Sequence, residues 1–143
     1  MGTDHQRSFA RHLPTAARIL IGFVFFASGL AGLLNVTPQP STPLPERAMA
    51  FADALVNTGY MMPLIFTTQL IVGALLLLNR FVPLALALLA PFVVNSVAFH
   101  TFLEPSGRPV ALIVLALEIY LAWSYREAFR PMLTMRAAPA ARQ

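Results

Sequence analysis

Among the polar side chains within the long apolar segments of this sequence, seven are of types and at positions that could do chemistry. They are Ser28, Asn35, Gln69, Asn95, Ser96, His100 and Glu118. Glu118 is the most informative, because its carboxyl group lies in the middle of the apolar run ALIVLALEIYLAWSY. A charged side chain at the centre of a bilayer costs about 2.5–3.5 kcal/mol on insertion scales. We therefore expect this carboxyl group to face other helices and to be hydrogen-bonded, protonated or both.

Two interpretations of Glu118 follow from the sequence. In the structural one, its carboxyl group bonds Gln69 or Asn95 and holds the helices in register. In the functional one, Glu118 is a proton acceptor or ligand anchor in a polar pocket, and His100 is a relay or second anchor at its mouth. Ser96 and His100 are four residues apart, on one helix face, whereas Asn95 points to a different neighbour. No residue has a pattern that identifies it as catalytic.

Several kinds of site are excluded by what the sequence lacks. There are no cysteines, which removes thiol exchange with quinone, iron–sulfur clusters and cysteine-rich zinc sites on this chain. His100 is the only histidine inside an apolar segment, and no Glu-x-x-His pattern occurs. We therefore predict no metal site.

The polar residues lie in four segments that are long enough to cross a membrane. The clearest is the uncharged run of residues 81–103, which reaches about 30 Å as a helix. Hydrophobic residues make up 57% of the chain and charged residues only 11%, against about 25% charged in soluble domains. We predict an all-α fold, a four-transmembrane-helix antiparallel bundle in the lipid bilayer, with spans at about residues 17–36, 60–79, 81–103 and 108–125.

A short amphipathic helix is expected between the first two spans. Four prolines between Thr37 and Pro45 prevent a long helix there. Beyond them, apolar residues recur at helical spacing over residues 45–58, with Glu46, Arg47 and Asp53 elsewhere on the cylinder. We place this helix flat on the outer surface, as a cap over the mouth of the bundle.

The arginines predict the orientation of the spans. With four spans, one side of the membrane holds Arg7, Arg11, Arg18, Arg80, Arg126, Arg130, Arg136 and Arg142. Only Arg47 and Arg108 remain on the other side, so the N- and C-termini should be cytoplasmic. The net charge of +4 is thus explained by topology, and no nucleic-acid partner is expected. The predicted parts are a cytoplasmic N-terminal tail (1–16), a membrane domain (17–126) and a cytoplasmic C-terminal tail (127–143).

Depth can be estimated from the helical rise. Counting from the outer boundary places Gln69 and Glu118 near the middle of the bilayer, and Ser28 and Asn95 somewhat closer to the outer surface. Asn35 and His100 fall near the outer rim. The sequence therefore predicts a polar cluster in the outer half, to which every span contributes.

The sequence resembles the DoxX/DoxD-like family of small bacterial integral membrane proteins over about residues 17–133. The most specific parts are LLLLNRFVPLALALLAPFVVNSVAFHTFLEPSG, with Asn95 and His100, and LALEIYLAWSYREAFRPML, with Glu118. RILIGFVFFASGL and NTGYMMPL agree with it. The resemblance implies a four-helix protein of the bacterial cytoplasmic (inner) membrane. It also implies membership of an oxidoreductase complex, as in relatives that form the membrane subunit of a thiosulfate:quinone oxidoreductase.

Three functions are compatible with these observations. The first is the membrane subunit of an oxidoreductase-type complex that binds quinone, while a soluble oxidoreductase partner performs the oxidation. The second is a non-enzymatic binder or transporter of a small lipophilic molecule. The third is a scaffold whose polar cluster only joins helices, within a homo-oligomer or against a partner.

Overall fold

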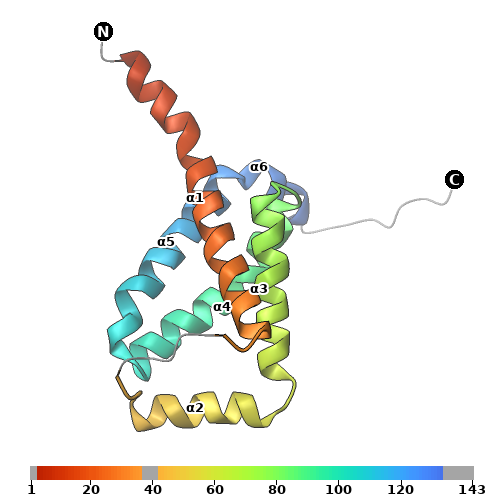
Figure 1. Cartoon of the computed structure of the whole chain (residues 1–143). Helices are drawn as coiled ribbons and strands as arrows, with labels where there is room; N and C mark the ends of the chain where they lie inside the picture. Colours follow the sequence, from red (N-terminus) through yellow and green to blue (C-terminus); the bar gives the residue numbers. More distant parts are fainter. Residues whose placement is uncertain (1–2, 37–41, 134–143) are drawn as a thin grey trace, which may run out of the picture.

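The computed structural model describes residues 3–36 and 42–133, and these residues form helices and connecting turns without any strand (Figure 1). The predicted all-α class is confirmed for this part of the chain. The longer helices are α1 (Thr3–Leu33), α2 (Glu46–Asn57), α3 (Met61–Leu77), α4 (Val82–Phe102) and α5 (Arg108–Ser124). The short helices are η1 (Pro105–Gly107), α6 (Arg126–Phe129) and η2 (Arg130–Leu133).

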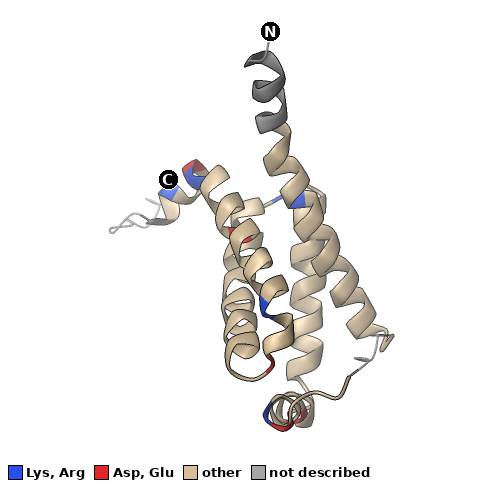
Figure 2. Ribbon diagram, turned by 90° about the vertical axis from the view of Figure 1, so that its left-hand side faces the viewer, with Lys and Arg blue, Asp and Glu red and all other residues tan. Residues whose placement is uncertain are grey.

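In the part of the chain that the structure describes, three segments are long and apolar enough to cross a membrane: His12–Leu33, Val82–Phe102 and Pro105–Ser124. A fourth crossing exists if α2 and α3 count as one span, although these two helices are bent by 90° relative to each other. Figure 2 shows that charged residues gather mainly at the two ends of the molecule, including α2, and are sparse along the body between them. This distribution is typical of a chain whose middle lies in hydrocarbon.

The long helices surround a common apolar core. Helix α1 packs against α3 and α5, and α4 packs against the same two helices. The most deeply buried large side chains are Leu76, Leu89, Leu121, Val72 and Val93, from α3, α4 and α5. Helix α2 runs across one end of this group (Figure 1). Phe51 of α2 meets Phe99 of α4 there, with ring centroids 5.5 Å apart.

Glycines allow α1 and α3 to approach closely. A methyl group added at Gly29 would lie 2.5 Å from the backbone nitrogen of Leu70, and one added at Gly73 would collide with the backbone of Phe26. Small residues at such positions are the usual means by which membrane helices pack, because they bring the backbones into van der Waals contact. Gly73 of α3 thus lies where the backbone of α1 comes close.

Arg18 of α1 contacts the C-terminal end of α3. Only 6% of its surface is exposed, and one guanidinium nitrogen donates to the carbonyl of Leu76, with the carbonyl of Leu77 at 3.5 Å. The last carbonyls of a helix have no partner within the helix, and a positive charge next to them is favoured by the helix dipole. Arg18 therefore caps α3, a structural role that its interpretation as a topology signal did not include.

The observed boundaries differ from the predicted ones mainly at α1. This helix begins at Thr3 and passes through Pro14, so most of the predicted N-terminal tail is helical. Residues 127–133 of the predicted C-terminal tail belong to α6 and η2. The rest of that tail, 134–143, and part of the proline-rich connection, 37–41, lie outside the described residues.

Gly73→Ala tests the packing of α1 on α3. Alanine normally favours a helix over glycine by about 1 kcal/mol. Here the added methyl group would overlap the backbone of Phe26, so we expect a loss of about 1–3 kcal/mol in the free energy of unfolding. Thermal unfolding in detergent measures the change. Ala116→Val, on an exposed position of α5, is the control and should change little; a stabilised Gly73→Ala would contradict the packing.

Candidate functional site

A cavity of about 350 Å³ lies beneath α2, between that helix and the adjacent segments of α3 and α4. Its walls are mostly apolar and include Phe51 and Leu55 of α2, Phe66 of α3 and Phe92 of α4. Four polar side chains that the sequence singled out also line it: Gln69, Asn95, Ser96 and His100. An apolar cavity with a few convergent polar groups is the usual form of a small-molecule site.

A second cavity, of about 180 Å³, shares part of this lining and lies between α1, α4 and α5. The shared residues are Gln69, Phe92, Ser96 and His100. Ser28 of α1 lines the second cavity only. The structure therefore gathers five of the seven predicted residues, Ser28 included, around two adjoining cavities.

Gln69 occupies the centre of this region. It lines both cavities and a third one of about 300 Å³ between α3 and α4, where Asn95 also lies. Only 7% of its surface is exposed, and its Oε1 atom is buried without a hydrogen-bond partner among the described residues. An amide oxygen left unpaired in this way costs free energy, which a ligand that donates a hydrogen bond would recover.

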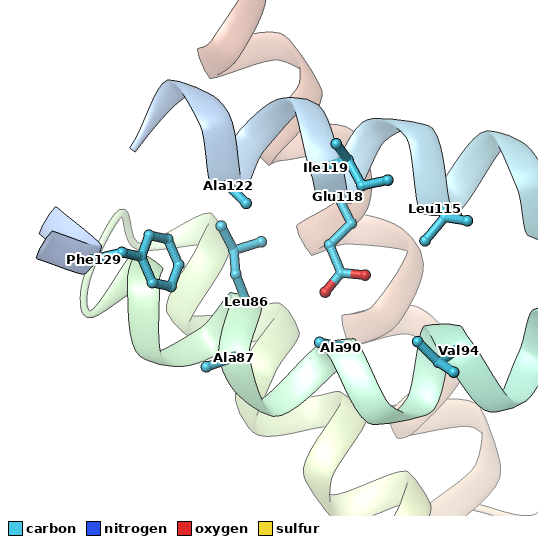
Figure 3. Close-up of a pocket in the computed structure, with 9 residues that line it drawn as sticks. All are labelled: Leu86, Ala87, Ala90, Val94, Leu115, Glu118, Ile119, Ala122 and Phe129. Atoms are coloured by element: carbon cyan, nitrogen blue, oxygen red, sulfur yellow. The ribbon is translucent and has the colours of Figure 1, made fainter. Parts of the chain in front are cut away.

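Glu118 lies elsewhere, and this corrects the prediction that it joins the cluster. Its carboxyl group points from α5 toward α4, into a separate cavity of about 240 Å³ (Figure 3). The other lining residues are apolar: Leu86, Ala87, Ala90, Val94, Leu115, Ile119, Ala122 and Phe129. Within the described chain, Glu118 makes no hydrogen bond to Gln69 or Asn95, and its Oε1 is buried and unpaired. Counting along a helix fixes the depth of a residue but not the neighbour that it faces.

Asn35 is also separate from the cluster, and its backbone conformation explains why an asparagine occurs at this position. With φ at 55°, it ends α1 in the left-handed conformation, and the amides of Asn35 and Val36 donate to the carbonyls of Gly32 and Ala31. This is a Schellman cap, for which asparagine is the usual alternative to glycine. Asn79 ends α3 in the same way, also with φ at 55°. Asn35 lines only a small cavity of about 130 Å³ against Met62 and Phe66.

The structure adds one site residue that the sequence reasoning missed, Glu104. The ring nitrogen Nδ1 of His100 lies 2.8 Å from Oε2 of Glu104 and 3.0 Å from the main-chain carbonyl oxygen of the same residue. The two residues are four apart and belong to the end of α4 and the turn after it. The sequence pattern that could have revealed it is His-x-x-x-Glu followed by Pro-Ser-Gly. In this pattern the glutamate caps the next helical turn, and capping brings its carboxylate back toward the histidine.

Glu104 is held firmly in that turn. Its Oε1 accepts hydrogen bonds from the Ser106 hydroxyl and, at 3.1 Å, from the Ser106 amide, while Oε2 accepts one from the Gly107 amide at 3.0 Å. The bond from the Ser106 hydroxyl, with those from Gly107 and His100, lowers the pKa of Glu104 below its ordinary value of 4.5, although burial acts in the opposite direction. Glu104 is therefore a carboxylate at neutral pH. The imidazole of His100 is packed directly over Gly107, where a methyl group would collide with the ring.

The region has no set of side chains that resembles a metal centre. Among the side chains of residues 12–36 and 42–133, no three histidine or acidic groups lie close enough together to hold an ion. The chemistry available is hydrogen bonding and proton exchange by two amides, two hydroxyls and an imidazole paired with a carboxylate.

Comparison with known proteins assigns the family. Residues 13–102 match the family model described as DoxX. The chain belongs to the DoxX family. The resemblance seen in the sequence is thus confirmed, and family membership together with the apolar helices makes this a multi-pass membrane protein in contact with lipid. Neither the curated proteins nor the solved structures give a match. The DoxX match includes Gln69, Asn95 and His100 and ends before Glu104 and Glu118.

Glu118→Leu tests whether the carboxyl group is unpaired. Replacing a buried polar group that has no partner by an apolar side chain of similar size removes a desolvation cost. We expect the free energy of unfolding to rise by about 1–3 kcal/mol, measured by thermal unfolding in detergent. Glu118→Gln, which keeps the polarity, should stay near the wild type. A loss of stability in Glu118→Leu would mean that the carboxyl group has a partner.

Proposed function

We propose that this DoxX family member is the membrane subunit of an oxidoreductase-type complex and binds a quinone or similar small lipophilic molecule beneath α2. The observation that carries the proposal is the cavity of about 350 Å³, whose apolar walls bring together Gln69, Asn95, Ser96 and His100. This volume lies at the lower end of the roughly 300–1,000 Å³ range of small-molecule sites.

The residues present fit a quinone head group. The ring would lie among aromatic side chains such as Phe66, Phe92 and Phe99. The amide nitrogens of Gln69 and Asn95, which both line the cavity, can donate hydrogen bonds to the two carbonyl oxygens. A bound quinone would supply the electron acceptor, while this chain's own residues bind and orient it. Glu118 lies outside this site.

Electron transfer to the quinone would require a second protein. The chain has no cysteine, and its side chains supply hydrogen bonds and proton exchange only. We assign the oxidation to a soluble partner, on the resemblance to quinone-linked relatives. If no partner acts with it, the same cavity makes the protein a non-enzymatic binder of lipophilic molecules.

The proposed topology follows from the helices and the arginines. Helices α1, α3, α4 and α5 form an antiparallel bundle of four spans in the bacterial inner membrane, with both termini cytoplasmic. The 90° bend between α2 and α3, and the charges Glu46, Arg47 and Asp53 on α2, support a surface position for α2 as the outer cap. The membrane domain would then occupy residues 17–126, with the chain ends 1–16 and 127–143 on the cytoplasmic side.

Ligand binding to pairs of matched variants tests the proposal. The probe is a short-tailed benzoquinone added to purified protein in nanodiscs, with binding followed by native mass spectrometry. Ala52 lines the cavity and Ala54 is exposed, so Ala52→Phe should abolish binding, whereas Ala54→Phe should leave it intact. Gln69→Leu removes a hydrogen-bonding group and should weaken binding about tenfold. Thr67→Leu, at an exposed position of the same helix, should not.

Two results would contradict the proposal. One is a wild-type protein that binds no benzoquinone and carries no co-purified lipophilic molecule. The other is an Ala52→Phe variant that binds as well as Ala54→Phe, since the site would then lie outside the cavity beneath α2.

A further inference from the structure

The pair of His100 and Glu104 determines what kind of hydrogen bond the cavity can offer. The ring of His100 lines both the cavity beneath α2 and the adjoining one toward α1 and α5. One edge of the ring is fixed by Glu104, and the ring lies against Gly107. His100 is thus a positioned group rather than a free side chain.

The main-chain carbonyl of Glu104 identifies which nitrogen carries the hydrogen. A carbonyl oxygen can only accept a hydrogen bond, and the oxygen of Glu104 lies 3.0 Å from Nδ1 of His100. The carboxylate oxygen at 2.8 Å from the same nitrogen also accepts. Both contacts therefore require a hydrogen on Nδ1, and a neutral imidazole with its hydrogen there has a bare lone pair on Nε2.

Nε2 remains available to a ligand. It has no hydrogen-bond partner among the described residues, and it is not one of the polar atoms sealed inside the protein. In an apolar cavity an acceptor of this kind selects for a molecule that brings a donor, because a ligand without one leaves the nitrogen desolvated and unpaired.

We propose that His100, positioned by Glu104, makes the cavity selective for a lipophilic molecule that carries a hydroxyl group on an aromatic ring, a hydroquinone or phenol, which donates its hydrogen bond to Nε2. This inference rests on the proposed function and adds to it a preference for the reduced form of the ligand. Glu104 acts as a positioning residue, because it fixes the tautomer and the direction of the ring and does not touch the cavity.

Gln69, which lines the cavity from α3, is consistent with such a ligand. The unpaired Oε1 of Gln69 is also an acceptor, and Gln69 and His100 line the same two cavities from α3 and α4. The Gln69 amide reaches a second hydroxyl group only by rotating, because its Oε1 is buried, whereas the ring of His100 is already fixed by Glu104. His100 is therefore the residue on which the selectivity depends.

Two probes that differ only in the donor test the selectivity. One is a short-tailed hydroquinone, kept anaerobic, and the other is its dimethyl ether, which has the same ring and cannot donate. We expect the wild type to bind the hydroquinone about tenfold more tightly than the ether. His100→Gln, whose amide both donates and accepts, should reduce this ratio to near one. His12→Phe, at an exposed position far from the cavity, should leave the ratio as in the wild type.

A second measurement needs no ligand. The chain has three histidines, so spectra of protein labelled with ¹⁵N-histidine can be assigned by substituting each in turn. In the wild-type protein, His100 should show a hydrogen on Nδ1 and a bare Nε2. A hydrogen on Nε2, in either the other tautomer or the doubly protonated ring, would overturn the inference.

The outcomes separate the two proposals. Equal binding of the hydroquinone and the ether by the wild type overturns the selectivity and leaves the cavity as a ligand site. Failure of both probes to bind overturns the proposed ligand class together with the selectivity.

Discussion

The structure depends on the rule that polar groups cannot be left facing hydrocarbon. Lipid offers no hydrogen bonds, so a strongly polar side chain within a span is more stable when it faces other helices or a cavity. Ser28, Gln69, Asn95, Ser96 and His100 come from three different helices and meet around two adjoining cavities. The same rule makes these cavities the place where a molecule with a polar head and an apolar body would be most stable.

Closely packed backbones in one pair of helices accompany cavities beneath α2 and between α3 and α4. Glycines bring α1 against α3, and Arg18 fixes their far ends, so this pair leaves little room between its backbones. Helix α2 reaches over the opposite part of the group and is held there by the contact of Phe51 with Phe99. The closely packed α1–α3 pair, together with α2 as a separate helix over the cavity, suits a site that a lipophilic ligand can enter.

The sequence predicted the helical class, the positions of the long apolar helices and most of the clustered residues, because period, length and depth can all be counted along the chain. It did not predict the neighbours of Glu118, since depth leaves the direction around the helix undetermined. It also missed the role of Glu104, which arises only when the turn Pro105–Gly107 folds back and offers two amides to the carboxylate. The sequence predicted a role of Arg18 in topology from its charge alone. Its capping of α3 depends on tertiary packing.

The binding site proposed beneath α2 depends most directly on that helix covering the cavity at the outer face of the membrane. Because the chain has no cysteine, labelling of single introduced cysteines is a clean test. Asp53 is on an exposed position of α2, and Phe51 lines the cavity. In intact spheroplasts, a membrane-impermeant maleimide should react rapidly with Asp53→Cys, slowly with Phe51→Cys, and with Arg126→Cys only after permeabilisation. Equal reaction of the two α2 positions, or labelling of Asp53→Cys only from the cytoplasmic side, would contradict the proposed position of α2.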